Sequence, residues 1–235
     1  MKKLLKMQTL SIYIALLAII ALFSILSPTF LSVSNALTIL RQISSLGIMA
    51  MGMMFVMLLG NVDLSVGTSV SLIGICMAYF MVNMHLSIGV TVLLGIAIGL
   101  VIGFLNGFVV TYCKIPSIIA TLGTSWVFKG LSYTICNAQP IYGFPEGFAK
   151  LGQGSAGPIP IPVILFIICV LITSFVMNRT VYGRTLYAVG SNKEASRLSG
   201  TNVNFMNLSA YVICAAFATL AGIILLSRVN SGQAS

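Results

Sequence analysis

Long apolar runs separated by short polar segments dominate the chain. Each run is continuous and close to the roughly 20 residues that a helix needs to cross a bilayer, whereas a β-barrel strand is short and alternates. The runs, with one more polar segment fifth in order, are residues 9–26, 43–60, 64–82, 86–112, 116–135, 161–177 and 205–226. The pattern predicts an all-α, polytopic membrane protein with about seven membrane segments in one transmembrane domain, residues 1–235.

The composition agrees with this pattern. Hydrophobic residues make up 58% of the chain and charged residues 6%, and the mean hydropathy is +1.08. Roughly a quarter of the residues of a soluble domain are charged, so a soluble protein is excluded. The basic N-terminus resembles a signal peptide, but the apolar run after it is too long and ends at Ser27-Pro28. We expect a retained first span, followed by a short interfacial helix in residues 30–42.

The distribution of basic residues predicts the orientation of the spans. With the N-terminus in the cytoplasm, the inside loops hold eight basic residues and the outside loops hold three, as the positive-inside rule requires. The eight are Lys2, Lys3, Lys6, Lys114, Arg179, Arg184, Lys193 and Arg197, and the three are Arg41, Lys150 and Arg228. This bias accounts for the net charge of +9. Membrane lipid is an expected partner and nucleic acid is not, because no basic helix face or aromatic platform accompanies the charges.

Residues that would carry enzymatic chemistry are missing from the sequence. The five cysteines are scattered without a CxxC pair, and the single histidine, His85, stands in a short turn. No phosphate-binding GxxxxGK[ST] loop, paired carboxylates or Ser/His/Asp combination occurs. The sequence therefore predicts that the chain is not an enzyme and holds no metal or cofactor itself.

Polar residues interrupt the apolar pattern at three places. Asp63 is the only carboxylate near the membrane region, and a lone buried charge needs partners or water. It could cap a helix that begins at Leu64, or line a transport path, and the two roles are compatible. The segment 116–135 carries Thr121, Thr124 and Lys129, which favours a polar cavity or a position wrapped by other helices. Asn106 could also face a cavity.

Small residues and a long loop give two further expectations. In the run 86–112 a glycine recurs every fourth residue, which places all of them on one face and favours close helix packing. These residues are Gly95, Gly99, Gly103 and Gly107. The Gly- and Pro-rich loop 136–160 is long enough to predict a structured cap.

The most polar stretch, residues 178–204, lies between two apolar runs and must lie outside the lipid. Ser191 to Glu194 fits the Ser-x-x-Glu capping box, so a short helix should begin there and end near Gly200. Such a helix can lie in a groove on a partner, although an ordinary polar loop is the alternative.

Several segments in the same order resemble bacterial ABC importer permeases of the ribose/galactose/xylose type, a monosaccharide family. The similar segments are GNVDLSVGTSVSLIG (60–74), NGFVVTYCKIPSIIATLGT (106–124), KGL (129–131), QPI (139–141) and YGRTLYAVGSNKEASRLSGTNV (182–203). Asn61 and Val62 replace the family's Gly-Ile, and Ser196 replaces an alanine. The family normally continues for several more spans, so we expect the chain to be incomplete at its C-terminus.

The resemblance implies a transport function in the bacterial inner membrane. A pair of permeases would form the translocation path for a monosaccharide such as ribose. It would be bound to two cytoplasmic ATP-binding subunits, which hold the ATP, and fed by an extracytoplasmic sugar-binding protein. The implied residues of the coupling loop 178–204 are Gly183, Arg184, Glu194, Ala195, Arg197 and Gly200. Those near the translocation path are Asn61, Asp63, Ser65, Asn106, Thr121, Thr124 and Lys129.

Other transport functions compete with this interpretation. Within the class, permeases for autoinducer-2 or branched-chain amino acids are the alternatives. A secondary transporter or channel would require paired intramembrane charges or an inverted repeat, and neither is visible. A purely structural membrane anchor needs only apolar spans, so the polar segment 116–135 and Asp63 argue against it.

Overall fold

The computed structural model describes the backbone of residues 2–234 and the side chains of residues 12–234. Within this range the chain is mostly helical, with one two-stranded antiparallel hairpin. The helices are α1 (Lys2–Leu26), α2 (Val33–Leu58), α3 (Val66–Val82), α4 (Ile88–Thr111), α5 (Ser117–Ile135), α6 (Lys150–Gln153), α7 (Ile161–Arg179), α8 (Val181–Ser191), α9 (Lys193–Leu198) and α10 (Val203–Val229). The strands are β1 (Ser155–Ala156) and β2 (Ile159–Pro160). The chain divides into two compact units, residues 1–40 and 41–235.

Four described helices, α2, α4, α7 and α10, are long and apolar enough to cross a membrane. The described part of α1, Ile12–Leu26, and the whole of α3 are shorter apolar helices. The prediction of a polytopic helical membrane protein is therefore confirmed. Of the basic residues that set the expected orientation, Lys2, Lys3 and Lys6 lie outside the described side chains.

The expectation of a separate interfacial helix before the second span is wrong. Residues 33–58 form one continuous helix, α2, because no proline or glycine pair interrupts the sequence between Val33 and Ile43. The polar residues in this stretch, such as Asn35 and Arg41, change the surface of the helix but not its backbone.

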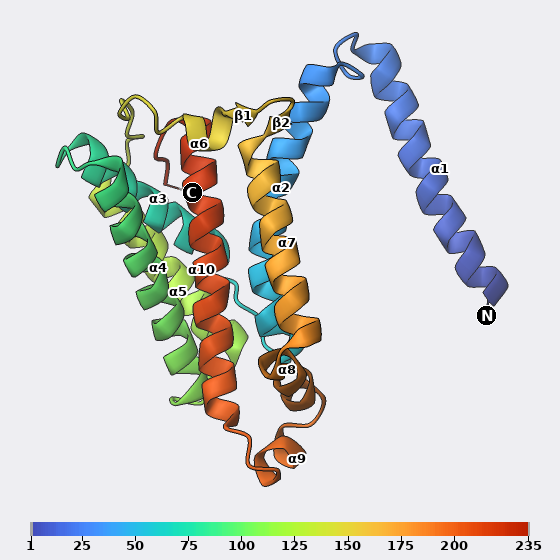
Figure 1. The fold of residues 1–235 in the computed structure, drawn as a ribbon, viewed down its shortest axis with the longest axis vertical. Coiled ribbons are helices and arrows are strands. Elements are labelled where there is room, and N and C mark those ends of the chain that lie inside the picture. The colour runs from blue at the N-terminus through green and yellow to red at the C-terminus, as the bar shows by residue number, and fades with distance from the viewer. Residues whose placement is uncertain (1, 235) are drawn as a thin grey trace. The chain divides into compact units, whose positions relative to one another are not determined.

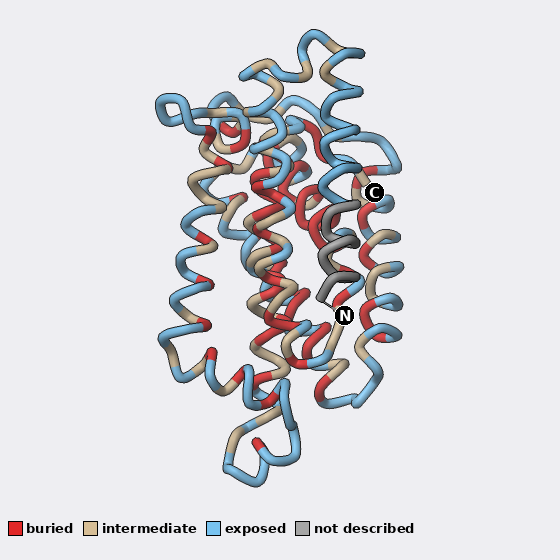
Figure 2. Tube along the Cα trace, turned by 90° about the vertical axis from the view of Figure 1, so that its right-hand side faces the viewer, coloured by how far each residue is buried: buried red, intermediate tan, exposed pale blue. Residues whose placement is uncertain are grey.

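Helix α10 forms the centre of the unit 41–235. In its most apolar stretch 56% of the residues are buried, against 33% or less in α2, α4 and α7. Helices α3, α4 and α5 lie on one side of α10 and α7 lies on the other (Figure 1). Buried residues follow the inner faces of these helices, while their outer faces are exposed and apolar (Figure 2). Exposed apolar faces of this extent suit contact with lipid tails.

The four glycines of α4 lie where this helix packs against α3 and α10. A Cβ at Gly95 would lie 2.6 Å from the Met77 sulfur, and one at Gly103 would lie 2.6 Å from the Ala215 Cβ. Gly99 faces the Thr219 side chain, and Gly107 faces Leu208. The absence of side chains therefore lets α4 approach α3 at Gly95 and α10 at Gly99, Gly103 and Gly107.

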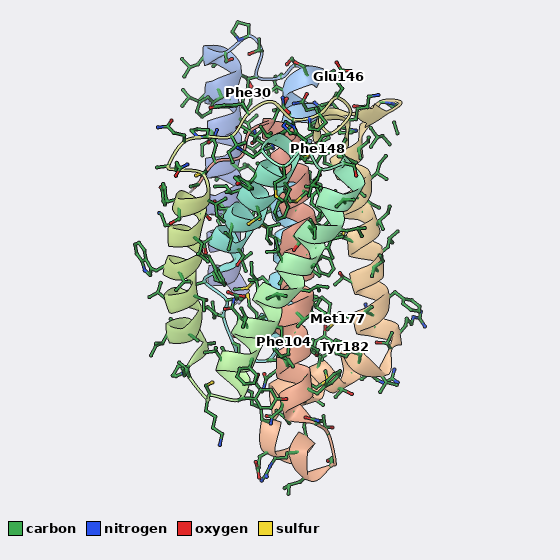
Figure 3. All side chains as sticks on the ribbon, turned by 90° about the vertical axis from the view of Figure 1, so that its left-hand side faces the viewer. Phe30, Phe104, Glu146, Phe148, Met177 and Tyr182 are labelled. Atoms are coloured by element: carbon green, nitrogen blue, oxygen red, sulfur yellow. The ribbon has the colours of Figure 1, made fainter. Side chains whose placement is uncertain are left out.

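The loop after α5 forms a structured cap, as predicted. Phe148 is fully buried beneath the loop (Figure 3), and the Ser227 hydroxyl of α10 donates to its carbonyl at 2.6 Å. The same hydroxyl accepts the Gly152 N–H at 2.7 Å. The Arg41 guanidinium donates to the Gln153 carbonyl at 3.3 Å, which ties the cap to α2. The cap is thus fixed at the end of the unit opposite α8 and α9 (Figure 1).

The close packing of α4 on α10 gives a stability prediction. We expect Gly103→Ala to lower the free energy of unfolding by about 1–3 kcal/mol, because its methyl group would overlap Ala215 and the Tyr211 carbonyl. The matched control is Gly123→Ala on α5, where no atom lies within 4 Å and a gain of up to about 1 kcal/mol is expected. Thermal unfolding in detergent measures both variants. Equal stability of the two would contradict the packing argument.

Candidate functional site

The chain leaves helical geometry between α2 and α3, inside the helical bundle. Gly60 has a φ of +74°, which a glycine adopts without strain, and the backbone stays irregular as far as α3. Backbone groups away from water need partners, and here side chains of α5 supply them. The Val62 N–H donates to the Ser117 hydroxyl at 3.3 Å, and the Leu64 N–H donates to the Thr121 hydroxyl at 3.0 Å.

Asp63 lies at the end of this interruption, with 7% of its surface exposed. One carboxylate oxygen, Oδ1, accepts both the Ser65 N–H at 2.9 Å and the Ser65 hydroxyl at 2.6 Å. The predicted helix start at Leu64 is wrong by two residues, because α3 begins at Val66. The carboxylate instead closes a local turn in front of the helix, where the positive end of the helix dipole also favours a negative charge.

Two further polar side chains, Asn106 of α4 and Tyr211 of α10, lie near the Asp63 carboxylate. Asn106 Nδ2 donates to the Ser65 hydroxyl at 2.7 Å, and its side chain also lies beside the Asp63 carboxylate. Asn106 is 1% exposed and Tyr211 is 0% exposed. In the described part of the chain, neither Asn106 Oδ1 nor the Tyr211 hydroxyl has a hydrogen-bond partner. Each unpaired buried group costs about 1–3 kcal/mol.

Four of the seven residues assigned to the path come together in one buried polar cluster, a fifth lies half-buried beside it, and two lie apart. The four are Asp63, Ser65, Asn106 and Thr121, and the fifth is Asn61, whose amide donates to the Asn207 side chain of α10 at 3.1 Å. Thr124 bonds back to the Thr121 carbonyl of its own helix at 3.2 Å. The Lys129 ammonium lies 5.9 Å from the ring centre of Trp126, which is 68% exposed, so it lies on the outer surface of this unit.

Sequence reasoning missed Asn207 and Tyr211. Tyr211 stands in the long apolar run of α10, where an aromatic residue is normally part of the core. Asn207 lies one turn before it, and this spacing on a single helix face is the only signal in the sequence that could have pointed to either residue. Neither position shows its partners in the sequence, because these come from the segment between α2 and α3 and from α5.

A cavity of about 340 Å³ lies on another side of α3, between α2, α3, α10 and the last described residues. Its wall includes Gly67, Ser71 and Gly74 of α3, with Gly222 of α10 opposite. None of the residues assigned to the path lines it. The polar cluster and the cavity are therefore separate features, and the cluster is closed in this conformation.

The polar stretch between α7 and α10 forms two short helices, α8 and α9. The predicted helix within it is confirmed, but the predicted cap residue is wrong. Asn192, not Ser191, is the N-cap, and its side-chain oxygen accepts the Ala195 N–H at 2.9 Å. Because the helix begins one residue later, Glu194 cannot reach back to the cap and bonds to Arg197 instead, with a shortest distance of 2.5 Å.

The remaining residues of the coupling loop have distinct surroundings. Gly200 follows α9 with a φ of +83°, as expected for a helix stop. A Cβ at Gly183 would overlap the Met177 carbonyl, so this glycine permits the tight junction of α7 and α8, where Met177 and Tyr182 lie close together (Figure 3). Glu194 and Arg197 are exposed, and their hydrogen bonds, followed by the charge of Arg197, lower the pKa of Glu194. Glu194 is therefore ionised at neutral pH.

Comparison with known proteins gives a consistent result. Residues 35–235 match the family described as the permease component of the branched-chain amino acid transport system. The chain is 36% identical to the ribose import permease of Haemophilus influenzae, over 94% of this chain and 69% of that protein. It is 37% identical to the ribose import permease of Bacillus subtilis (97% and 71% covered) and 33% to the D-allose permease of Escherichia coli K12 (94% and 68%). No solved structure matches the chain significantly.

The chain therefore belongs to this family of bacterial ABC importer permeases. It is a multi-pass membrane protein and the permease component of a transporter, not an enzyme, and ATP is bound by a separate subunit of such transporters. Importers of this class generally work with ATPase and binding-protein partners.

The hydrogen bonds of Asp63 give a prediction that distinguishes the role of its acceptor oxygen from the role of its negative charge. We expect Asp63→Ala to lower the free energy of unfolding by about 1–3 kcal/mol, because the Ser65 N–H and hydroxyl lose their acceptor. Asp63→Asn keeps an acceptor oxygen and should recover most of this loss. Glu146→Ala, which removes an exposed carboxylate, is the control and should leave thermal unfolding unchanged. Equal stability of the alanine variant and the wild type would contradict the proposed turn.

Proposed function

We propose that the chain is the membrane subunit of an ATP-driven importer for a monosaccharide, with ribose the first candidate. The observation that carries this proposal is the 36–37% identity to two ribose import permeases over nearly the whole chain. The D-allose permease, at 33%, supports the wider class of sugars. The family description names branched-chain amino acids, so these, with autoinducer-2, are the substrates to exclude by experiment.

The proposed assembly contains two permease copies, two cytoplasmic ATP-binding subunits and an extracytoplasmic sugar-binding protein. In this assembly the N-terminus is cytoplasmic and about seven segments of the single domain 1–235 lie in the membrane. The four long apolar helices, the shorter α1 and α3, and the more polar α5 are the candidates for these segments. The stretch 178–204, with α8 and α9, then faces the cytoplasm, and the cap on α10 faces outward.

Helix α9 and its surroundings are the proposed contact with the ATPase. The helix is short and exposed, with Leu198 78% exposed at its end. Movement of this segment would reach the membrane helices through α8, which packs against Phe55, Met177 and Tyr211 in one apolar core. The residues proposed to act here are Gly183, Arg184, Glu194, Ala195, Arg197 and Gly200.

The buried polar cluster is the proposed lining of the translocation path in its closed state. A polar cluster in the middle of an apolar bundle is costly, and ionisable residues at such positions usually mark solute pathways. Rigid-body movement of packed helix groups, driven by the ATPase, would open it to each side in turn. Thr124 and Lys129 lie apart from the closed cluster. They belong to the path only if α5 turns or faces the second permease copy.

Uptake measurements test the substrate proposal. Cells that lack their own sugar importers and express this permease with its ATPase and binding protein should accumulate radiolabelled D-ribose in an ATP-dependent manner. D-allose should compete, whereas L-leucine and autoinducer-2 should not. Uptake of leucine or autoinducer-2 without uptake of any sugar would contradict the proposal.

The exposed pair on α9 gives a prediction about coupling. A surface ion pair of this kind adds little to stability, so Glu194→Ala should leave thermal unfolding unchanged. We nevertheless expect it to reduce co-purification of the ATPase subunit and solute-stimulated ATP hydrolysis several-fold. Gly200→Pro should act in the same direction, and Glu146→Ala is the control that should retain the ATPase. If both coupling variants keep normal ATPase binding and uptake, α9 is not the contact.

A further inference from the structure

We propose that Asn106 and Tyr211 form a hydrogen-bonding subsite for hydroxyl groups of the transported solute, beside the Asp63–Ser65 pair. The inference rests on the proposed function as a sugar importer and adds to it the two residues that contact the solute. Tyr211 is the new element, because no sequence pattern assigned it a role in transport.

The first observation is the unpaired Tyr211 hydroxyl. The residue is 0% exposed, and its ring packs in the apolar core with Phe55, Leu186 and Cys214. The Ser117 side chain faces the phenol, but the two hydroxyls do not reach hydrogen-bonding geometry. A phenylalanine would fill the same space without an unpaired polar atom. The hydroxyl therefore lacks a partner among the described residues in the closed conformation.

The second observation is independent and concerns Asn106. Its Nδ2 is paired with Ser65, whereas Oδ1 has no partner within the described residues. Turning the amide by 180° would only exchange the ends and leave an amino group unpaired instead. One end of this amide therefore lacks a partner in either orientation, at a residue that is 1% exposed.

A polyol could supply hydrogen-bond partners for both Asn106 Oδ1 and the Tyr211 hydroxyl. A sugar hydroxyl can donate to Asn106 Oδ1 and can either donate to or accept from the Tyr211 hydroxyl. Adjacent hydroxyls on one ring present both kinds of group within a few ångströms. The Asp63 carboxylate beside them adds a further acceptor, whereas the Ser65 hydroxyl already donates to Asp63 and accepts from Asn106. The aliphatic side chain of a branched-chain amino acid could pair with neither group, so only its ammonium and carboxylate would compete with a sugar hydroxyl here.

The packing of the helices explains how the solute would reach a closed site. The glycines of α4 hold this helix against α10 at backbone distance, with a Cβ at Gly103 only 2.8 Å from the Tyr211 carbonyl. Asn106 and Tyr211 thus belong to one tightly packed pair of helices. Asp63 and its turn are tied by hydrogen bonds to α5, and the Asn106–Ser65 and Asn61–Asn207 bonds also link the turn to α4 and α10. Separation of the two groups would break these two links and expose the subsite between them.

The test compares uptake of D-ribose and of the analogues that each lack one of its hydroxyl groups by the complete transporter. Tyr211→Phe removes only the hydroxyl. We expect it to raise the KM for D-ribose roughly threefold to tenfold, as the loss of one hydrogen bond predicts, while one deoxy analogue is taken up equally by variant and wild type. Tyr79→Phe, on the partly exposed end of α3, is the matched control and should change no KM ratio. Protein levels in the membrane are measured in parallel.

The other possible outcomes overturn either the subsite or the proposed function. A Tyr211→Phe variant with wild-type KM values for every sugar overturns the subsite. Equal losses for D-ribose and for every deoxy analogue also overturn it, because they show that the hydroxyl pairs with no hydroxyl of the sugar. If the wild type takes up leucine or autoinducer-2 but no sugar, the proposed function fails first, and the subsite fails with it.

Discussion

The pairing of the irregular backbone between α2 and α3 is the constraint on which the unit 41–235 depends. Backbone that leaves helical geometry inside an apolar bundle loses its own hydrogen bonds and cannot replace them with water. Here α5 supplies the hydroxyls of Ser117 and Thr121, and Asp63 closes the turn through Ser65. Helices α4 and α10 add Asn106 and Asn207. Three helices are thereby held at one height around the interruption.

Close packing between α4 and α10 stabilises the unit together with these hydrogen bonds. The glycines of α4 remove the side chains that would keep it away from α10, and this approach brings Tyr211 to the polar cluster. At the far end of α10, a single hydroxyl on Ser227 holds two backbone groups of the cap. The unit thus combines a rigid helix pair, a hydrogen-bonded group around α3 and α5, and a fixed cap. Such packed groups move as bodies rather than deform continuously.

The proposed coupling loop, residues 178–204, contains two helices that differ in how firmly they are packed. Helix α8 is anchored in the apolar core by Leu186 and Val189, whereas α9 is held mainly by its cap and one exposed ion pair. A short helix of this kind can change position at small cost in free energy, while the packing of α8 against α7 and α10 suits the proposed transmission of this movement. This contrast suits a segment that a partner subunit is proposed to move.

The sequence by itself determined the helical spans, the packing face of α4, the structured cap and the short helix near Gly200, because each depends on periodicity or local turn chemistry along one segment. The family resemblance pointed to the segments that hold Asp63 and Asn106. Two predictions from local sequence were wrong for local reasons, since residues 33–42 continue into α2 and Asn192 rather than Ser191 caps α9. Only the tertiary structure separated Lys129 from the polar cluster and revealed Asn207 and Tyr211. The physical reason is that a residue's partners across helices depend on the rotation and height of each helix, and these are set by packing between segments far apart in the chain.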